Sequence, residues 1–344
     1  MRLIIYNLET DLNSPVLAAA HHWIEAFAQH VDQVVVYSTH IGRLNLASNV
    51  EVHEIGGGTV VKRAVALIRL FVSFFRELPF RKESIVFHHM SPRTLLVLGP
   101  LYRLARVNQG LWYSHSKKSF SLRASKYFAN KIFSSTPTAI PISGDKLRFV
   151  GHGVKSEKFT EALAKSGKSR RGIVALGRIS PIKRLEQIID AISHTRIADM
   201  NLTFIGSSKV DDQYEVKLVE LARLKDISLK IIGSLPYESI PQKLCEFDAI
   251  YTGTPKSVDK AAIEGAICGC FVLTTEEQTL HLTGMKEVFR FLGFEDTPPL
   301  SVQITTLANL SAEMQSKMRA TLSARAAELN DINETTLKIL SALE

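Results

Sequence analysis

Two positively charged side chains, Arg178 and Lys183, have the types and spacing needed to hold a diphosphate. Their segment, 177–183, follows an apolar run over 172–176 and precedes an amphipathic run over 184–193. This pattern predicts a strand, a turn and a helix, so both cations would lie beside a helix N-terminus, where backbone N–H groups attract anions. The alternative is an ordinary solvated loop between a strand and a helix.

A second segment, 259–273, places a carboxylate among neighbours that cannot pair with it. Glu264 is surrounded by alanine, isoleucine and glycine in a predicted helix that begins near Asp259 and Lys260. A buried carboxylate needs hydrogen-bond donors, and the hydroxyls of a ribose would supply them. The alternative is a carboxylate that caps the helix or forms a salt bridge.

Strands and helices alternate along most of the 344 residues, in two successive series. Such alternation predicts parallel sheets covered by helices, and these sheets bind ligands at the carboxyl ends of their strands. The first domain is expected over 1–159 and the second over 173–311, with a polar, glycine-containing linker over 160–172. The remaining residues, 312–344, are expected to form a helical tail.

Taken together, these segments resemble the family 4 glycosyltransferases, and the resemblance covers nearly all of residues 172–275. The matching stretches are Gly177-Arg178-x-x-x-x-Lys183, Glu264-Gly265-Ala266-x-x-Gly269, 204–206, 231–236 and 247–249. The resemblance implies an α/β fold of two doubly wound Rossmann-like domains facing one another across a cleft (GT-B). It also implies a nucleotide-diphosphate sugar as donor, retention of anomeric configuration, and neither a metal nor another cofactor.

The resemblance also implies roles for single residues. Arg178 and Lys183 would neutralise the leaving diphosphate, Glu264 would hold the ribose, and the loop over 233–237 would lie near the base. The implied catalytic residues are His115, Arg178 and Lys183. The implied donor-binding residues are Glu264, Gly206, Gly233, Ser234, Leu235, Asp259 and Lys260.

The N-terminal half resembles the family more loosely, through 111–115, a strand ending in His115, and through 149–159. The glycine pair that is usual after the first strand is missing, and Asn13 stands nearest to its position. Lys117 and Lys118 begin a basic cluster that would attract an anionic acceptor, such as a lipid diphosphate, or would simply be a solvated face. We therefore expect these three residues on the acceptor side.

One position departs from the family pattern near the donor sugar. The family commonly has a glutamate eight residues before the one matched by Glu264, and this chain has Lys256 there. The change removes the usual acidic contact to the sugar. Either Lys256 or Lys260 would instead favour a donor sugar that carries a carboxylate.

Two other functions remain open at this point. One is a sugar-nucleotide epimerase of the same fold, which would need no acceptor. The other is a non-catalytic subunit that binds a nucleotide sugar, an alternative that Lys256 supports. A dehydrogenase is not expected, because no G-x-G-x-x-G follows the first strand.

Composition limits the partners and the location. The net charge of +8 suits phosphorylated substrates or an anionic membrane surface, while no nucleic-acid-binding motif is present. Three cysteines, two of them in a C-x-C pair, fit a reducing compartment better than a disulfide framework. No stretch resembles a signal peptide or a membrane span, so a cytoplasmic protein is expected, with a glycan or lipid-linked acceptor.

Residues 60–78 form a basic amphipathic pattern. Lys62, Arg69 and Arg76 recur every seven residues and share one helical face, with bulky apolar residues around the rest. The pattern is typical of helices that rest on the cytoplasmic face of a membrane. The alternative is a domain helix whose apolar face lies in the core.

Overall fold

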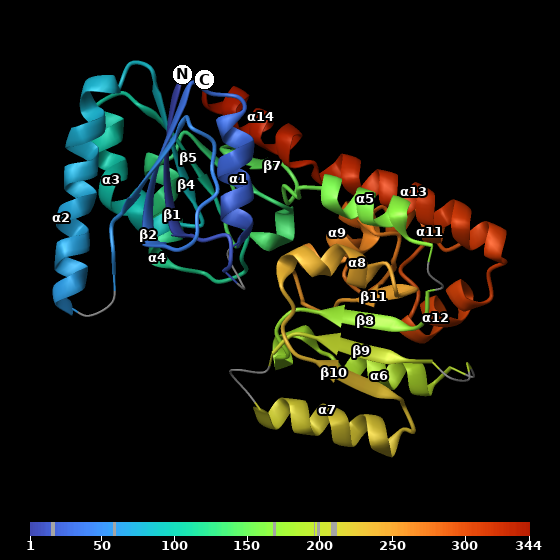
Figure 1. The fold of residues 1–344 in the computed structure, drawn as a ribbon. Helices are drawn as coiled ribbons and strands as arrows, with labels where there is room; N and C mark the ends of the chain where they lie inside the picture. Colours follow the sequence, from blue (N-terminus) through green and yellow to red (C-terminus); the bar gives the residue numbers. More distant parts are fainter. Residues whose placement is uncertain (15–17, 58–59, 168–169, 196, 198–199, 208–211) are drawn as a thin grey trace. The chain divides into compact units, whose positions relative to one another are not determined.

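The computed structural model divides the chain into two compact units, Met1–Gly153 with Asp331–Glu344, and Val154–Asn330. Each unit contains one parallel sheet flanked by helices (Figure 1). The two doubly wound α/β units confirm the predicted fold class. The residues that the structure describes are 1–14, 18–57, 60–167, 170–195, 197, 200–207 and 212–344.

The first unit has a seven-stranded sheet in the order β3-β2-β1-β4-β5-β6-β7. Its strands are β1 (Arg2–Thr10), β2 (Gln33–Ile41), β3 (Val50–Glu54), β4 (Ser84–His89), β5 (Asn108–Trp112), β6 (Lys131–Ser134) and β7 (Leu147–Phe149). Its helices are α1 (Ala18–Ala28), α2 (Val60–Glu77), α3 (Pro92–Leu104), α4 (Phe120–Phe128) and α14 (Ile332–Leu343), with 3-10 turns η1 (Leu78–Phe80) and η2 (Pro137–Ala139). The strand order reverses between β1 and β4, which is the topological switch point where doubly wound sheets bind ligands.

Alternating side chains of β1 separate two cores on the two faces of this sheet. Leu3 and Ile5 pack in a cluster with residues of α1 and α14. Ile4 and Tyr6 pack in a second cluster with residues of α2 and α3. Helices therefore cover both faces, and the loops that carry function are left at the strand ends.

A buried carboxylate fixes helix α2 against the sheet. Glu77 is 1% exposed and accepts hydrogen bonds from Arg2 Nε at 2.8 Å and from the Tyr37 hydroxyl at 2.7 Å. A buried charge is tolerated only when it is paired in this way. The last turn of α2 is consequently tied to both β1 and β2.

The second unit has a five-stranded parallel sheet in the order β10-β9-β8-β11-β12. Its strands are β8 (Ile173–Leu176), β9 (Leu202–Ile205), β10 (Leu229–Ile232), β11 (Ala249–Tyr251) and β12 (Phe271–Leu273). Its helices are α5 (Glu157–Lys165), α6 (Glu186–Ser193), α7 (Asp212–Leu224), α8 (Ile240–Leu244), α9 (Lys260–Ile267), α10 (Glu277–Thr283), α11 (Met285–Phe291), α12 (Leu300–Ala308) and α13 (Ala312–Asn330), with 3-10 turns η3 (Pro181–Lys183) and η4 (Tyr237–Ser239).

The boundaries between the units differ from the predicted ones. The first half of the expected linker is part of α5, because Phe159 and Ala162 are buried in the second core. The expected tail is helical but is divided, since α13 belongs to the second unit and α14 to the first. The chain therefore passes between units at Gly153–Val154 and returns at Asn330–Asp331.

Two further expectations concern the chain as a whole. All three cysteines are buried and free. In the part of the chain that the structure describes, no helix combines the length and the apolarity that crossing a bilayer needs.

Candidate active site

The residues expected to bind the donor gather at the carboxyl edge of the second sheet. Arg178 and Lys183 follow β8, Gly206 follows β9, and the loop over 233–235 follows β10. Helix α9 begins just after the turn that follows β11. Because all five strands are parallel, these turns share one edge, as the sequence predicts.

Two glycines bring the β8 and β9 turns into direct contact. Gly206 has φ +151°, and a Cβ added there would lie 1.8 Å from the carbonyl oxygen of Gly177. The amide of Gly177 donates to Ile205 O at 2.9 Å, and that of Ile179 donates to Ser207 O at 3.1 Å. The backbone of the cationic turn is thus held by β9 rather than left as a free loop.

Lys183 is held by an acidic partner from the start of α9. Its Nζ lies 2.8 Å from Asp259 Oδ2, and both side chains are mostly buried. The same oxygen accepts hydrogen bonds from Thr252 at 2.5 Å and Thr254 at 2.8 Å. Burial alone would raise the pKa of Asp259, but Lys183 and the two hydroxyls hold that pKa below its ordinary value.

Arg178 differs from Lys183 in having an exposed side chain. The two cations nevertheless border one depression, which Gly177, Thr252 and Asp259 also line. The surface here therefore combines a lysine fixed by an ion pair with an exposed arginine. Sequence reasoning found both cations and Asp259, but it missed the pairing of Asp259 with Lys183 and the two threonines.

Glu264 lies in α9 and is 4% exposed. Its Oε1 accepts a hydrogen bond from the Tyr237 hydroxyl at 2.6 Å and lies 3.3 Å from Lys260 Nζ. Lys260 Nζ also donates to the Tyr237 hydroxyl at 3.2 Å and lies 5.1 Å from the centre of its ring. Burial, followed by the nearby Glu264 charge, raises the pKa of Tyr237 far above its ordinary value, so this hydroxyl acts as a donor.

This network shows that the salt-bridge alternative for Glu264 is present, while its contact with a ribose stays a prediction. The carboxylate does form a salt bridge within its helix, but only one of its oxygens is engaged by the contacts above. A carboxylate has about four lone-pair sites, so Oε2 retains capacity for a ligand hydroxyl. Tyr237 is the functional neighbour that sequence reasoning placed near the base without recognising its bond to Glu264.

The loop after β10 is open. Gly233 and Ser234 are exposed, Leu235 is half-buried, and a Cβ added to Gly233 would meet nothing within 4 Å. The expected position of these residues at the sheet edge is confirmed by the end of β10 at Ile232. Their contact with a base stays a prediction.

Lys256 occupies a tight turn after β11. Its φ of 59° lies in the left-handed region, and its backbone amide donates to Glu276 Oε2 at 2.9 Å. The side chain of Lys256 is exposed. Glu276, which follows β12, therefore places a carboxylate beside Lys256.

The first unit has its own set of expected residues at the carboxyl edge of β5. His115 is exposed, and its Nδ1 accepts a hydrogen bond from the Lys117 amide at 2.9 Å. In the neutral ring the proton is then on Nε2, which can donate to a ligand hydroxyl. Lys117 and Lys118 are exposed in the same loop, and Asn13 is exposed in the loop after β1.

The paired histidines of β4 have structural environments. His88 is fully buried, stacks on Tyr6 with ring centres 5.3 Å apart, and bonds Thr94 through Nδ1 at 2.9 Å. Burial lowers its pKa to about 3, so the ring stays neutral. His89 lies 5.2 Å from the ring centres of both Trp23 and Trp112.

One cluster of possible metal ligands exists among the described residues. His21, His22 and Glu25 on α1 bring their ligand atoms within 4.8 Å of one another. His21 Nε2 accepts from the Asn45 amide at 3.1 Å, which places the ring proton on Nδ1 facing Glu25. The Nδ1 atoms of His21 and His22 lie 3.8 Å and 3.3 Å from Glu25 Oε2.

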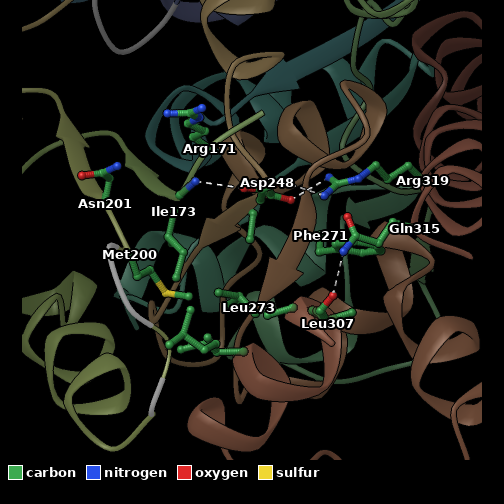
Figure 2. Close-up of a pocket in the computed structure, with 15 residues that line it drawn as sticks. Arg171, Ile173, Met200, Asn201, Asp248, Phe271, Leu273, Leu307, Gln315 and Arg319 are labelled. Atoms are coloured by element: carbon green, nitrogen blue, oxygen red, sulfur yellow. Dashed lines mark hydrogen bonds and ion pairs between the residues drawn. The ribbon is translucent and has the colours of Figure 1, made fainter. Parts of the chain in front are cut away.

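A larger cavity of about 420 Å³ lies at the opposite, amino-terminal edge of the second sheet (Figure 2). It opens beside the first residues of β8, β11 and β12, and its walls are mainly apolar. Its polar groups are engaged with each other: Asp248 accepts from the Gly172 amide at 2.9 Å and pairs with Arg319 at 3.1 Å. It lies at the strand ends remote from Lys183 and the other residues expected to bind the donor.

Comparison with known proteins shows likeness in structure alone. The chain matches no family model and no curated protein sequence. HepE of Anabaena, solved in complex with UDP and glucose, shares 14% identity at a TM-score of 0.71, over 100% of this chain and 99% of that one. Sucrose-phosphate synthase of Thermosynechococcus elongatus shares 14% identity at a TM-score of 0.68, over 99% and 97%.

A third similar structure is a trehalose-6-phosphate synthase studied for glycosyl transfer with retention. It shares 11% identity at a TM-score of 0.66, over 100% of this chain and 99% of that one. At these identities the likeness establishes the fold. The chain has the two-Rossmann-domain (GT-B) fold along its whole length.

The contact between the β8 and β9 turns generates a first prediction. Gly206→Ala should lower the free energy of unfolding by about 1–3 kcal/mol from backbone strain alone, with more from the clash with Gly177. Urea unfolding followed by circular dichroism measures this. The matched control, Gly233→Ala, has open space around it and should stay within about 0.5 kcal/mol of wild type. Equal stability of the two variants would contradict the proposed contact.

Proposed function

We propose that the chain is a glycosyltransferase that moves a sugar from a nucleotide-diphosphate sugar onto an acceptor. The observation that carries the proposal is one sheet edge holding an exposed arginine, a lysine fixed by an ion pair and a buried carboxylate. These are Arg178, Lys183 and Glu264. Structural neighbours solved with UDP and glucose support the donor class.

The proposed roles of the two cations follow from where negative charge develops during sugar transfer. As the bond between the anomeric carbon and the diphosphate lengthens, negative charge grows on the leaving oxygen. Lys183 Nζ carries three protons, so it can keep its bond to Asp259 and still donate to that diphosphate. The exposed Arg178 side chain turns toward the diphosphate and provides a second cation that stabilises the leaving group.

The remaining roles complete the proposal. Glu264 Oε2 accepts from ribose hydroxyls, and His115 Nε2 donates to the transferred sugar. We propose retention of configuration, which the trehalose-6-phosphate synthase likeness supports, and hexosyl transfer without a metal. The acceptor is a glycan or lipid-linked precursor, and the three free cysteines support a cytoplasmic location.

A second function is favoured by one specific observation. Lys256 stands where an acidic sugar contact is expected, so a non-catalytic subunit that binds nucleotide sugars is the competing proposal. A sugar-nucleotide epimerase is distinguished by its product. Incubation with nucleotide sugars, with and without a panel of acceptors, separates the three by whether a glycoside, a new nucleotide sugar or nothing is formed.

Loss of either cation should reduce turnover strongly. Arg178→Ala and Lys183→Ala should each lower kcat/KM about 10²–10³-fold, because each removes a donor to the leaving diphosphate. Release of nucleoside diphosphate from the donor in the presence of acceptor measures this. Arg223→Ala, an exposed arginine on α7, is the matched control and should be unaffected. Near-normal turnover of both site variants would refute the diphosphate assignment.

Glu264→Gln should weaken the binding of a nucleoside diphosphate by about tenfold or more. The amide keeps the shape of the side chain but exchanges a charged acceptor for a neutral one. Isothermal titration calorimetry with uridine diphosphate and its purine counterparts measures the affinity. Glu238→Gln, an exposed neighbour of Tyr237, should leave that affinity unchanged. If Glu264→Gln binds the nucleoside diphosphate as tightly as wild type does, Glu264 does not hold the ribose.

Lys256 should influence the choice of donor sugar. Lys256→Glu should lower the preference for uridine diphosphate glucuronate relative to the glucose donor by about tenfold, since a carboxylate would then face a carboxylate. The ratio of kcat/KM for the two donors measures the effect. Lys230→Glu, an exposed residue of β10, is the control for charge alone. If the ratio of kcat/KM for the two donors is unchanged in Lys256→Glu, Lys256 does not contact the donor sugar.

A further inference from the structure

Helix α2 has two apolar faces, and only one of them is used by the core. Phe74 is buried with Tyr102, and the Ser73 hydroxyl lies 2.8 Å from that of Tyr6. On the outer face Ile68, Val72 and Phe75 are 62%, 58% and 64% exposed. These three recur at helical spacing, so they form one continuous stripe that faces away from the sheet.

The stripe extends along the helix and into the turn that follows it. Val65, Leu67 and Phe71 are also exposed large apolar residues of α2, and Phe80 of η1 is 42% exposed. Contiguous apolar surface of this kind on a globular protein marks a site of interaction. The inner face of α2 therefore packs in the core, whereas the apolar side chains on its outer face do not take part in it.

The charges on α2 and η1 are mainly positive, although Arg76 is paired with Glu51 of β3 at 2.5 Å. Residues 60–82 contain six lysines or arginines and a single acidic residue, Glu77, which is buried and paired with Arg2. Lys62, Arg69 and Arg76 border the stripe on one side, by their seven-residue spacing. Arg81 and Lys82 follow Phe80 and are exposed.

The positive field continues beyond α2 in the same layer of helices. Between Glu83 and Asp145 the chain has no acidic residue, although it passes through α3 and α4. A long-chain cation can extend past an apolar stripe while its methylene groups cover it. An apolar stripe bordered by cations is the arrangement that fits a layer of acyl chains beneath anionic headgroups.

We propose that the outer face of α2, with η1, docks on an anionic lipid bilayer and lies in the plane of its headgroups. A second copy of the chain fits this face poorly. A symmetric pairing would bring the same cations of both copies together across the interface, and such like-charge contacts are unfavourable. The proposal does not depend on the glycosyltransferase assignment, because it concerns a different surface of the first unit.

The test is co-sedimentation with vesicles of phosphatidylcholine alone and of phosphatidylcholine mixed with phosphatidylglycerol, at low and high salt. Wild-type protein should bind the anionic vesicles at least tenfold more than the neutral ones, and high salt should release it. Protein that stays in the supernatant with anionic vesicles at low salt overturns the proposal. Equal binding to both vesicle types at low salt overturns it as well.

Two sets of variants separate the apolar stripe from the charges. The first, Ile68→Gln, Val72→Gln and Phe75→Gln together, changes only side chains outside the core and should cut binding at least tenfold. Its matched control is Val216→Gln, Val219→Gln and Leu224→Gln on α7, which are 56%, 49% and 78% exposed and should leave binding unchanged. The second set, Lys62→Gln, Arg81→Gln and Lys82→Gln, should weaken binding and reduce its dependence on salt.

Tryptophan fluorescence reports contact between the stripe and the bilayer directly, so the test does not depend on loss of binding alone. Phe75→Trp places an indole on the stripe, and its emission should shift to the blue with anionic vesicles only, since Trp23 and Trp112 are already buried. Circular dichroism confirms that every variant is folded. If the glutamine variant instead changes the sedimentation coefficient without changing vesicle binding, the stripe joins two copies of the chain and the membrane proposal is wrong.

Discussion

The ion pair between Lys183 and Asp259 is the interaction on which the rest of the candidate site depends. It joins the turn after β8 to the start of α9, and the hydroxyls of Thr252 and Thr254 bring the turn after β11 to the same oxygen. A buried ion pair contributes little stability on its own, because desolvation of both charges opposes their attraction. Its value here is geometric, since the turn after β8 and the turn between β11 and α9 converge on one carboxylate.

This arrangement sets the charge that an incoming anion would meet. Lys183 is already neutralised by Asp259, and Lys260 is already neutralised by Glu264, so Arg178 supplies the net positive charge. Two internally paired lysines avoid the repulsion that bare cations would exert on each other at one sheet edge. Each can still donate a second hydrogen bond, because an ammonium group has three protons.

The sequence predicts the parts of this site that local pattern determines. Strand, turn and helix over 172–193 are read from periodicity, and parallel topology then places Arg178 and Lys183 at the carboxyl edge. The bond from Tyr237 to Glu264 joins positions 27 residues apart, so no local pattern can reveal it.

The predicted domain boundaries differ from those of the two compact units for a related physical reason. An amphipathic helix such as α5 or α13 shows that one face will be buried, but not which core will bury it. In the structure Phe159 enters the second core, and the Val154 amide donates to Asn330 O at 2.7 Å, so the two crossing points of the chain are joined within that unit. The polar composition of 160–172 describes the exposed face of α5 and gives no sign of this contact.

Helix α2 shows how one buried group decides a question that periodicity leaves open. Apolar residues surround most of this helix, so sequence alone allows either face to enter the core. Glu77 removes that freedom, because its carboxylate must reach both Arg2 and Tyr37 to be tolerated without solvent. With Glu77 turned inward, Phe74 follows it into the core, and Ile68, Val72 and Phe75 are turned outward. The exposed stripe is therefore a consequence of how the helix is anchored. A contiguous apolar surface that the core leaves uncovered marks a site of contact with something outside the chain.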